Sequence, residues 1–262
     1  DHGGSVSTTQ EYNAADNAIA LLAKELGKKA VYKRFKNRSL SYKKIFDKEL
    51  KLLRPRLQNG EWYKPFNPNA GANFTKNIGF IEGNAWQYAF MIPHDILGLK
   101  KLMGGKKEFT NQLQKIFDTN QFDMANEPDI AYPFLFNYAK GEEWRSQKMV
   151  EKLVRKHFKN APNGIPGNDD TGTMSAWVVY AMMGFYPIAP GEPKYTITKP
   201  LFDKITIKLD PKYYKNSELI IEKATNKNGY IKKILINGKK HKSYFINHNQ
   251  LVNGKIMKVI LK

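Results

Sequence analysis

The hydrophobic pattern of the chain changes its period near Pro187. After this point apolar and polar residues alternate, as at Ile205 and Ile207, which is the period of a β-strand. Before it, apolar residues recur at three- and four-residue spacing, which is the period of an amphipathic helix. This change predicts two domains, a helical part over 1–189 and a strand-rich part over 190–262.

The helical part shows about seven or eight helical patterns, many of them joined in pairs by short loops. The predicted helices cover 14–26, 29–46, 82–92, 95–103, 107–117, 129–138, 144–158 and 174–183. Helices in such pairs are the pattern of an (α/α)6 toroid, of which this chain would hold only a part. The fold class expected is therefore mainly α, a partial toroid followed by a small antiparallel β-sandwich segment of about five to seven strands. Asn237-Gly238 marks a hairpin in that segment.

Composition excludes several classes of protein. The chain of 262 residues contains no cysteine, so disulfides, thiolate metal sites and thiol catalysis are excluded. It contains no run of about 18 apolar residues, so no membrane span is expected. The net charge of +19 is compatible with nucleic-acid binding, but the lysines are spread along the chain and no zinc-finger or RNA-recognition motif is present. A lysine-rich, solvated surface is the interpretation preferred here, and no nucleic-acid partner is expected.

The stretch 166–187 carries two adjacent carboxylates, Asp169 and Asp170, between a Gly-Asn turn and an apolar helix. One carboxylate is enough to cap the helix, because a single side-chain oxygen satisfies the free backbone N–H groups. The second is in excess of that need. At a helix start the positive end of the dipole favours ionised carboxylates, which suits a general base or a metal ligand. Capping alone and a catalytic role both remain open from these residues.

A second stretch begins at Glu82, where an irregular loop over 51–81 meets a predicted helix. Its neighbours Ile81, Ala85 and Trp86 are apolar, and a carboxylic acid in apolar surroundings holds its proton more tightly, as a general acid requires. A solvated glutamate at a helix start is the simpler alternative.

Polar residues follow Glu82 along this stretch. Asn84 and Gln87 offer amide oxygens suited to calcium or to sugar hydroxyls. His94 and Asp95 open the next predicted helix, where His94 is either a cap or a ligand.

A third stretch places Asn126 and Glu127 directly before Pro128. Proline holds the preceding residue in an extended conformation and fits the first turn of a helix, so Glu127 is expected just before the helix that follows. In the loop over 51–81, aromatic residues are equally well explained as sugar-stacking or as core residues: Trp62, Tyr63, Phe66 and Phe74. His241 and His248 show no metal-ligand spacing and are expected at the surface.

Three motifs together resemble glycoside hydrolase family 92, the calcium-dependent exo-α-mannosidases. They are EGNAWQY with the PHD at 93–95, NEPDIAYPFLFNYA, and PGNDDTGTMSAW followed by GFYP, in the family's order. The opening HGGSVSTTQEY is also similar. The resemblance covers most of the chain and is weakest over the last 60 or so residues.

The resemblance implies a function and a set of roles. It implies an inverting α-mannosidase that removes terminal mannose from glycans, with Glu82 as general acid, Asp170 as general base and Asp169 supporting or exchanging with it. Sugar-binding roles are implied for five residues, namely Asn84, Trp86, His94, Asn126 and Glu127. The family's calcium binds the O2 and O3 hydroxyls of the sugar, and Gln87 and Glu127 are the ligands expected. The family acts on glycans outside the cell, so a secreted, periplasmic or cell-surface protein is expected.

The chain departs from the family in two ways. Family members are far longer, so this chain is expected to be a fragment that lacks the N-terminal part of its parent and has little activity alone. Many members continue NEP with Ser-His-His, whereas this chain has Asp129, Ile130 and Ala131, which leaves the linkage preference open. Three alternatives remain: a non-catalytic carbohydrate-binding protein of the same fold, a toroidal glycosidase for another sugar, and a basic nucleic-acid binder.

Overall fold

The computed structural model describes residues 3–71, 78–224 and 229–262, so His2 and Phe74 of the predictions above lie outside the described residues. The chain forms two compact units. The first comprises Asp1–Tyr132 and Ala189–Glu192, and the second comprises Pro133–Ile188 and Pro193–Lys262. The predicted division at residue 189 follows the type of secondary structure instead, and it stays a prediction. No helix of the described chain is long and apolar enough to cross a membrane.

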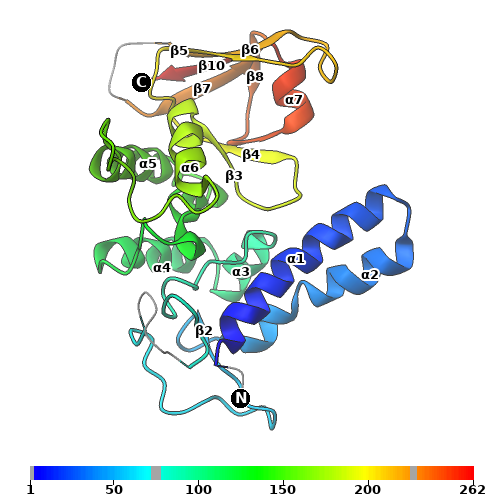
Figure 1. Ribbon diagram of the computed structural model, residues 1–262, viewed down its shortest axis with the longest axis vertical. Coiled ribbons are helices and arrows are strands. Elements are labelled where there is room, and N and C mark those ends of the chain that lie inside the picture. Colours follow the sequence, from blue (N-terminus) through cyan, green and yellow to red (C-terminus); the bar gives the residue numbers. More distant parts are fainter. Residues whose placement is uncertain (1–2, 72–77, 225–228) are drawn as a thin grey trace. The chain divides into compact units, whose positions relative to one another are not determined.

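The first unit is built around a pair of antiparallel helices that lie side by side (Figure 1). These are α1 (Ser5–Glu25) and α2 (Lys29–Arg38), and Gly27 with φ 67° makes the reversal between them. The remaining elements of this unit are η1 (Ser41–Ile45), β1 (Phe46–Asp47), β2 (Leu52–Leu53), α3 (Ile96–Leu102), α4 (Lys106–Asp118) and η2 (Glu127–Asp129). Asp95 caps α3 by accepting a hydrogen bond from the Gly98 amide (3.1 Å), so the cap is Asp95 and not His94.

The buried face of α1 is polar. Gln10 donates from Nε2 to the backbone oxygens of Tyr88 (2.8 Å) and Met91 (3.1 Å). Asn13 accepts from the Tyr42 amide (2.8 Å) and donates to the Arg38 carbonyl (3.1 Å). These side chains satisfy backbone groups of segments that have no regular ladder of their own, so α1 holds irregular chain in place through hydrogen bonds.

The opposite face of α1 is apolar and exposed. Tyr12, Ile19, Leu22 and Leu26 are between 42% and 62% exposed. Tyr12, Ile19 and Leu26 follow one another at intervals of seven residues, and Leu22 lies between the last two. This is the spacing of residues that pack against another helix. The helix therefore presents polar groups inward and an apolar stripe outward, the reverse of an ordinary surface helix.

The second unit combines helices with two sheets. Its helical elements are η3 (Tyr132–Tyr138, of which all but Tyr132 belong to this unit), α5 (Glu143–His157), α6 (Thr173–Met183) and α7 (His248–Asn253). Its strands are β3 (Phe185–Pro187), β4 (Lys194–Ile197), β5 (Lys204–Lys208), β6 (Glu218–Ala224), β7 (Ile231–Ile236), β8 (Lys239–His241), β9 (Phe245–Asn247) and β10 (Ile256–Leu261). They form a five-stranded sheet in the order β5-β6-β10-β7-β8 and a three-stranded sheet in the order β3-β4-β9.

One core is shared by the two sheets of this unit. It takes apolar residues from both sheets and from α7, including Phe185, Ile197, Ile221, Ile234, Ile246, Leu251 and Val259. A second layer of aromatic rings lies against it, where Phe134 stacks on Tyr186 with ring centroids 4.3 Å apart. Asn137 ties this layer to β4 by donating to the Ile197 carbonyl (2.8 Å).

The structure agrees with most predicted elements and corrects four. The predicted helix over 29–46 ends at Arg38, and η1 and the start of β1 follow within that range. The chain has more helix than strand, as predicted, and Asn237 and Gly238 both have positive φ, as the predicted hairpin requires. The predicted helix over 82–92 is a run of hydrogen-bonded turns, and that over 129–138 is two 3₁₀ segments. The larger sheet is mixed rather than antiparallel, because β10 inserts between β6 and β7 and pairs in parallel with β6.

We predict that Asn13→Ala lowers the free energy of unfolding by about 2 kcal/mol, because it leaves the buried Tyr42 amide and Arg38 carbonyl without their partner. Urea titration of the variant and wild type measures this change. Asn111→Ala on the exposed face of α4 is the matched control and should change stability by less than about 0.5 kcal/mol. Equal losses in the two variants would contradict the role given to the polar face of α1.

Candidate active site

Glu82 lies on a loop of the first unit in a left-handed backbone conformation, with φ 57°. This conformation is uncommon for a residue other than glycine, asparagine or aspartate. Its side chain is exposed, as is that of Ile81. The apolar surroundings predicted for this carboxyl group are therefore wrong within the described chain, because Ala85 and Trp86 are buried and Glu82 is not. The Glu82 carboxylate has no hydrogen bond or ion pair with any described residue.

Asn84 and Gln87 form a reciprocal pair within one turn. The Asn84 Oδ1 accepts from the amides of Trp86 (2.9 Å) and Gln87 (3.1 Å), and the Gln87 Oε1 accepts from the Asn84 amide (3.0 Å). This is the arrangement of a capping box, made here at a run of turns that is not an α-helix. The Asn84 Nδ2 also donates to Gln121 (3.0 Å), a residue that the sequence analysis did not single out.

The hydroxyl groups of two buried tyrosines hold this segment by hydrogen bonds to its backbone. The Tyr132 hydroxyl donates to the Gln87 carbonyl (2.6 Å) and accepts from the Phe90 amide (2.8 Å). The Tyr88 hydroxyl donates to the Ile81 carbonyl (2.8 Å) beside Glu82. Backbone groups on both sides of Glu82 are thus held by side chains, which fixes the loop without a helix.

Trp86, predicted to bind sugar, is 8% exposed in this structure. Its Nε1 donates to Asn69 (2.7 Å), and the Lys115 ammonium lies 4.5 Å from the centre of its ring. The contacts of Trp86 in the described chain are therefore structural.

His94 is also buried, at 9% exposed. Its Nε2 lies 2.7 Å from the Ser39 carbonyl, which can only accept, so Nε2 carries the proton. Burial is the largest effect on the pKa of His94 and lowers it. The hydrogen bond to the Ser39 carbonyl opposes burial, Lys36 lowers the pKa further, and Asp95 and Asp16 raise it by smaller amounts. Like Trp86, His94 has structural contacts, and its predicted sugar contact stays a prediction.

Asn126 joins the third stretch to the first. Its Nδ2 donates to the backbone oxygen of Glu82, and its Oδ1 accepts from the Glu127 amide (3.1 Å). Glu127 is half-buried and begins η2. The structure therefore brings Glu82, Asn84, Gln87 and Asn126 together on one side of the first unit, with Glu127 adjacent.

Asp129, where many family members have serine, is fully buried. Its Oδ2 accepts from the Asp123 amide (2.9 Å), while its Oδ1 has no partner among the described residues. Burial raises the pKa of this carboxyl group well above its usual range. A carboxyl group in this position closes the turn from Asp123 to Asp129 and so fixes Asn126 and Glu127. Its burial could not be predicted from the sequence, because a single aspartate after Glu-Pro resembles any turn residue.

The two adjacent aspartates of the second unit have different contacts. The Asp169 carboxylate accepts from the Ser175 hydroxyl (2.7 Å) and the Ser175 amide (2.8 Å), so it caps the first turn of α6. The hydrogen bond from the Ser175 hydroxyl, followed by that from its amide, holds the pKa of Asp169 below its usual value. Asp169 is therefore ionised and engaged in holding the helix start.

Asp170 has an exposed carboxylate that forms no hydrogen bond or ion pair with a described residue. Its backbone has φ 40°, and it is followed by Thr171 with φ 57° and Gly172 with φ 87°. Three consecutive left-handed residues are unusual, and a β-branched residue such as Thr171 is strained there. The Asp170 carbonyl holds this turn by accepting from the hydroxyls of Thr171 (2.6 Å) and Thr173 (2.7 Å).

The oxygens of the first unit fit an open calcium site. Calcium takes six to eight oxygen ligands, including amide and carboxylate oxygens. Gln87 Oε1 accepts one hydrogen bond and keeps a second lone pair, and Gly83 leaves it space, since a Cβ there would lie 2.9 Å from it. No group of three or more acidic, histidine or cysteine side chains in the described chain could hold a metal. Most ligands of an ion held here would therefore come from water or substrate.

Comparison with known proteins identifies the chain. The model of a protein family described as "Glycosyl hydrolase family 92 catalytic domain" matches residues 1–262. The chain belongs to this family of glycosidases. An uncharacterized secreted glycosidase of Arthroderma benhamiae is 31% identical over 98% of this chain. The chain covers 35% of that relative.

Solved structures give the same family. A family 92 α-mannosidase of Bacteroides thetaiotaomicron in complex with mannoimidazole is 31% identical, with a TM-score of 0.91 over 99% of this chain and 36% of the other. A family 92 inverting mannosidase of the same organism is 26% identical, with a TM-score of 0.86 over 97% of this chain and 37% of the other. The chain thus spans a little over a third of the length of the relatives it matches.

We predict that the stability of the first unit falls as the pH falls below about 6.5, because the unfolded chain binds a proton at His94 that the folded chain does not. The loss begins at the ordinary histidine pKa and continues down to the lowered pKa of folded His94. Urea titrations at pH about 7.5 and about 5.5 measure it. His94→Gln should be less stable at the higher pH but should show a smaller loss between the two pH values. His241→Gln, in the second unit, should keep the loss of the wild type; an unchanged loss in His94→Gln would contradict the prediction.

Proposed function

We propose that this chain carries catalytic residues of a glycosidase that removes terminal α-linked mannose from glycans with inversion. One observation supports this most directly. Glu82 and Asp170 are both exposed, both lack a partner among the described residues, and both stand on left-handed backbone. Strained backbone that the surroundings hold in place is concentrated at functional sites.

The roles follow from the chemistry of glycoside hydrolysis. An inverting enzyme needs one carboxylic acid to protonate the leaving oxygen and one carboxylate to take a proton from the attacking water. Glu82 is proposed as the acid and Asp170 as the base. Asp169 is proposed as a supporting residue, since its two bonds to Ser175 fix the turn that carries Asp170. An exposed Glu82 would gain its apolar surroundings only when substrate covers it.

Substrate and calcium are proposed to meet beside Glu82. Gln87 and Glu127 are the proposed calcium ligands, and calcium bound there would draw the O2 and O3 hydroxyls of the sugar to itself. Asn84 and Asn126 line the same side of the unit and fix it through backbone contacts. Trp86 and His94 remain proposed as sugar-binding residues by family resemblance, although their contacts here are structural. Asp129 is proposed to influence the linkage by fixing Glu127.

The chain is proposed to act as part of a longer polypeptide. Its relatives are nearly three times as long, and α1 presents the apolar stripe of Tyr12, Ile19, Leu22 and Leu26, which further helices of an (α/α)6 toroid would cover. Residues 1–262 alone are therefore expected to have little or no activity. Because a relative is named a secreted glycosidase, action on glycans outside the cell is also proposed.

We predict that Glu82→Gln and Asp170→Asn each lower kcat by a factor of about 10² to 10⁴, as expected when a general acid or base is removed. The measurement is hydrolysis of an α-mannobiose panel by the full-length protein that contains this chain. Proton NMR of the first product should show the β-anomer of mannose if the reaction inverts. Glu25→Gln and Asp210→Asn, at exposed sites elsewhere in the two units, should retain activity. Folded protein with no mannose release on any linkage would favour a non-catalytic binding protein.

We also predict that chelation abolishes mannose release and that added calcium restores it. Gln87→Ala should raise the calcium concentration needed for half-maximal activity, because it removes one protein ligand from a site with few. Gln114→Ala, on α4, is the control and should leave that concentration unchanged. Full activity after exhaustive chelation would contradict the calcium proposal while leaving the roles of Glu82 and Asp170 intact.

A further inference from the structure

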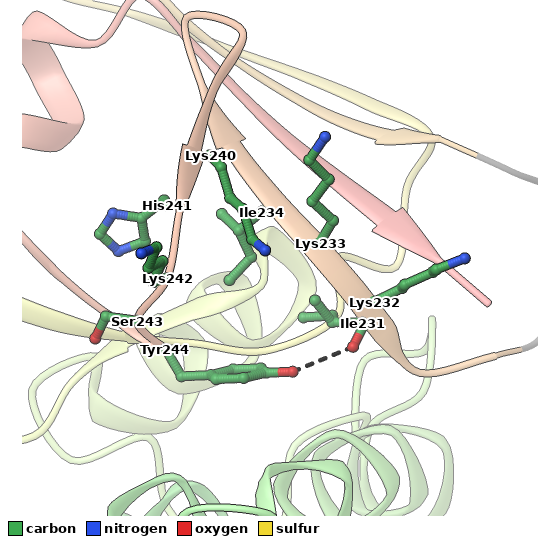
Figure 2. Close-up of a pocket in the computed structure, with 9 residues that line it drawn as sticks. All are labelled: Ile231, Lys232, Lys233, Ile234, Lys240, His241, Lys242, Ser243 and Tyr244. Carbon is green, nitrogen blue, oxygen red and sulfur yellow. Dashed lines mark hydrogen bonds between the residues drawn. The ribbon is translucent and has the colours of Figure 1, made fainter.

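A cavity of about 190 Å³ lies at the edge of the five-stranded sheet in the second unit (Figure 2). It is formed between β7, β8 and the loop that leaves β8. Ile231 and Ile234 are its buried apolar residues, and the ring of Tyr244 crosses its lower side, where the hydroxyl donates to the Ile231 carbonyl (3.2 Å). Its remaining lining residues are Lys232, Lys233, Lys240, His241, Lys242 and Ser243.

Four lysines surround this cavity, and none of them is neutralised. Lys232, Lys233, Lys240 and Lys242 have no ion pair with any residue of the described chain, and all four are exposed. The sequence over 223–262 holds ten lysines and no aspartate or glutamate. Among carboxylates, Glu143 contributes to the raised pKa of Tyr244, after the larger effect of burial. The edge of this sheet is therefore a concentrated positive charge.

Backbone geometry places the lysines at the cavity. β10 pairs with Lys233 and Ile231 but skips Lys232, so a bulge puts two consecutive lysines outside instead of one. β8 is only three residues long and pairs with Ile234 to Ile236 of β7. The first half of β7 is thus left uncovered by β8, and the cavity occupies that space.

Some hydrogen-bonding groups of the cavity already bind other residues of the protein, and others can donate to a ligand. The His241 Nε2 lies 2.9 Å from the Phe245 carbonyl, so it is a donor already in use. The Ser243 Oγ accepts from the Phe245 amide (3.0 Å), which leaves its own proton to donate. Available donors are therefore the Ser243 hydroxyl and the four ammonium groups, whose flexible stems let them turn toward a ligand. Figure 2 shows Lys240 lying over Ile234, whereas Lys232 and Lys233 extend from the strand.

Lysines on an edge strand also have a simpler explanation, since charge there prevents pairing with another sheet. The other edge strand of the same sheet, β5, shows which features are enough to prevent such pairing. β5 carries Lys204 and Lys208, both exposed, and pairs with β6 without a bulge. The β7–β8 edge adds an apolar floor, an aromatic ring and a free hydroxyl proton. These features are in excess of what edge protection requires.

We propose that this cavity binds the charged substituent of an anionic sugar, a phosphate or sulfate ester on a glycan. The ammonium groups and Ser243 would donate to the ester oxygens. The apolar floor and the Tyr244 ring would cover the less polar face of the pyranose. At about 190 Å³ the space is smaller than that of drug-sized ligands, which suits one monosaccharide unit.

A sugar is favoured over a nucleic acid for a physical reason. Single-stranded nucleic acid is bound along a basic groove with successive aromatic side chains for base stacking. This site has one aromatic ring, whose hydroxyl is fixed to β7, and one small space rather than an extended groove. None of the proposed catalytic residues lines this cavity, so binding here can be measured separately from hydrolysis of mannosides.

The test is calorimetric titration of residues 1–262 with glucose 6-phosphate at about 50 mM salt, where exposed charges are weakly screened. Glucose is chosen because it is not the sugar of the proposed substrate, so a failure here leaves the mannosidase proposal untouched. The double variant Lys240→Gln, Lys242→Gln should bind about tenfold more weakly, and so should wild type at about 200 mM salt. The matched control is Lys204→Gln, Lys208→Gln, which removes the same charge from the opposite edge and should change the affinity less than about twofold.

Single results decide between the alternatives. Weak or absent binding of glucose and of inorganic phosphate, with saturable binding of glucose 6-phosphate, supports a site for both parts of the ligand. Equal loss in the two double variants would reduce the effect to net charge and overturn the proposal. Phosphate binding as tightly as the sugar phosphate would overturn the sugar contact, and tighter binding of a tetrathymidylate of comparable charge would assign the site to nucleic acid. No saturable binding of glucose 6-phosphate would also overturn it. Ser243→Ala, which removes one donor without changing charge, should weaken binding about threefold.

Discussion

The first unit depends on the buried polar face of α1. In a strand ladder or a helix, backbone groups bind one another. In the irregular chain around α1, side chains bind them instead, namely those of Ser7, Gln10 and Asn13. The Ser7 hydroxyl accepts from the Ile81 amide (3.0 Å), one residue before Glu82, and Gln10 reaches the far end of the same turn at Tyr88 and Met91. A segment held at both ends in this way can keep Glu82 in an unfavourable backbone conformation. An apolar face on α1 would bury more surface but would leave those backbone groups without partners.

The two adjacent aspartates show how one motif serves both structure and chemistry. Asp169 accepts two hydrogen bonds from Ser175 and so caps the first turn of α6, which is one of the two alternatives that the sequence left open for this pair. Because the cap is complete, Asp170 is not needed for it and its carboxylate stays free. The left-handed run from Asp170 to Gly172 turns that carboxylate out of the path of the helix. This strained backbone supports the role proposed for Asp170, because such strain is concentrated at functional sites.

The sequence predicted regular elements well, because period and caps are local properties. α4, α5 and α6 fall within a few residues of their predicted bounds. It failed where side chains from distant segments decide the backbone. The turn over 84–90 has a helical pattern, yet Tyr132 takes the Phe90 amide and the Gln87 carbonyl, and these bonds replace helical ones. Neither the burial of Asp129 nor the insertion of β10 between β6 and β7 could be predicted, since both depend on contacts between segments far apart in the chain. The candidate residues themselves came from motif resemblance, and the structure adds which of them are free and which are engaged.

The strand topology concentrates part of the protein's positive charge at one sheet edge. Lysines that look dispersed in the sequence are brought to one edge by a hairpin and a bulge, because β7 and β8 carry three of the four cavity lysines, Lys232, Lys233 and Lys240. Strand edges elsewhere in the sheet carry isolated lysines between apolar residues, as in β5. Repulsion between the lysines at the β7–β8 edge therefore lowers the stability of the free protein. The wider spacing of the lysines in β5 shows that a sheet edge can avoid this repulsion. A sheet that keeps such a cost beside an open apolar floor gains stability when an anion arrives, so the same charges that weaken the free protein would strengthen its complex.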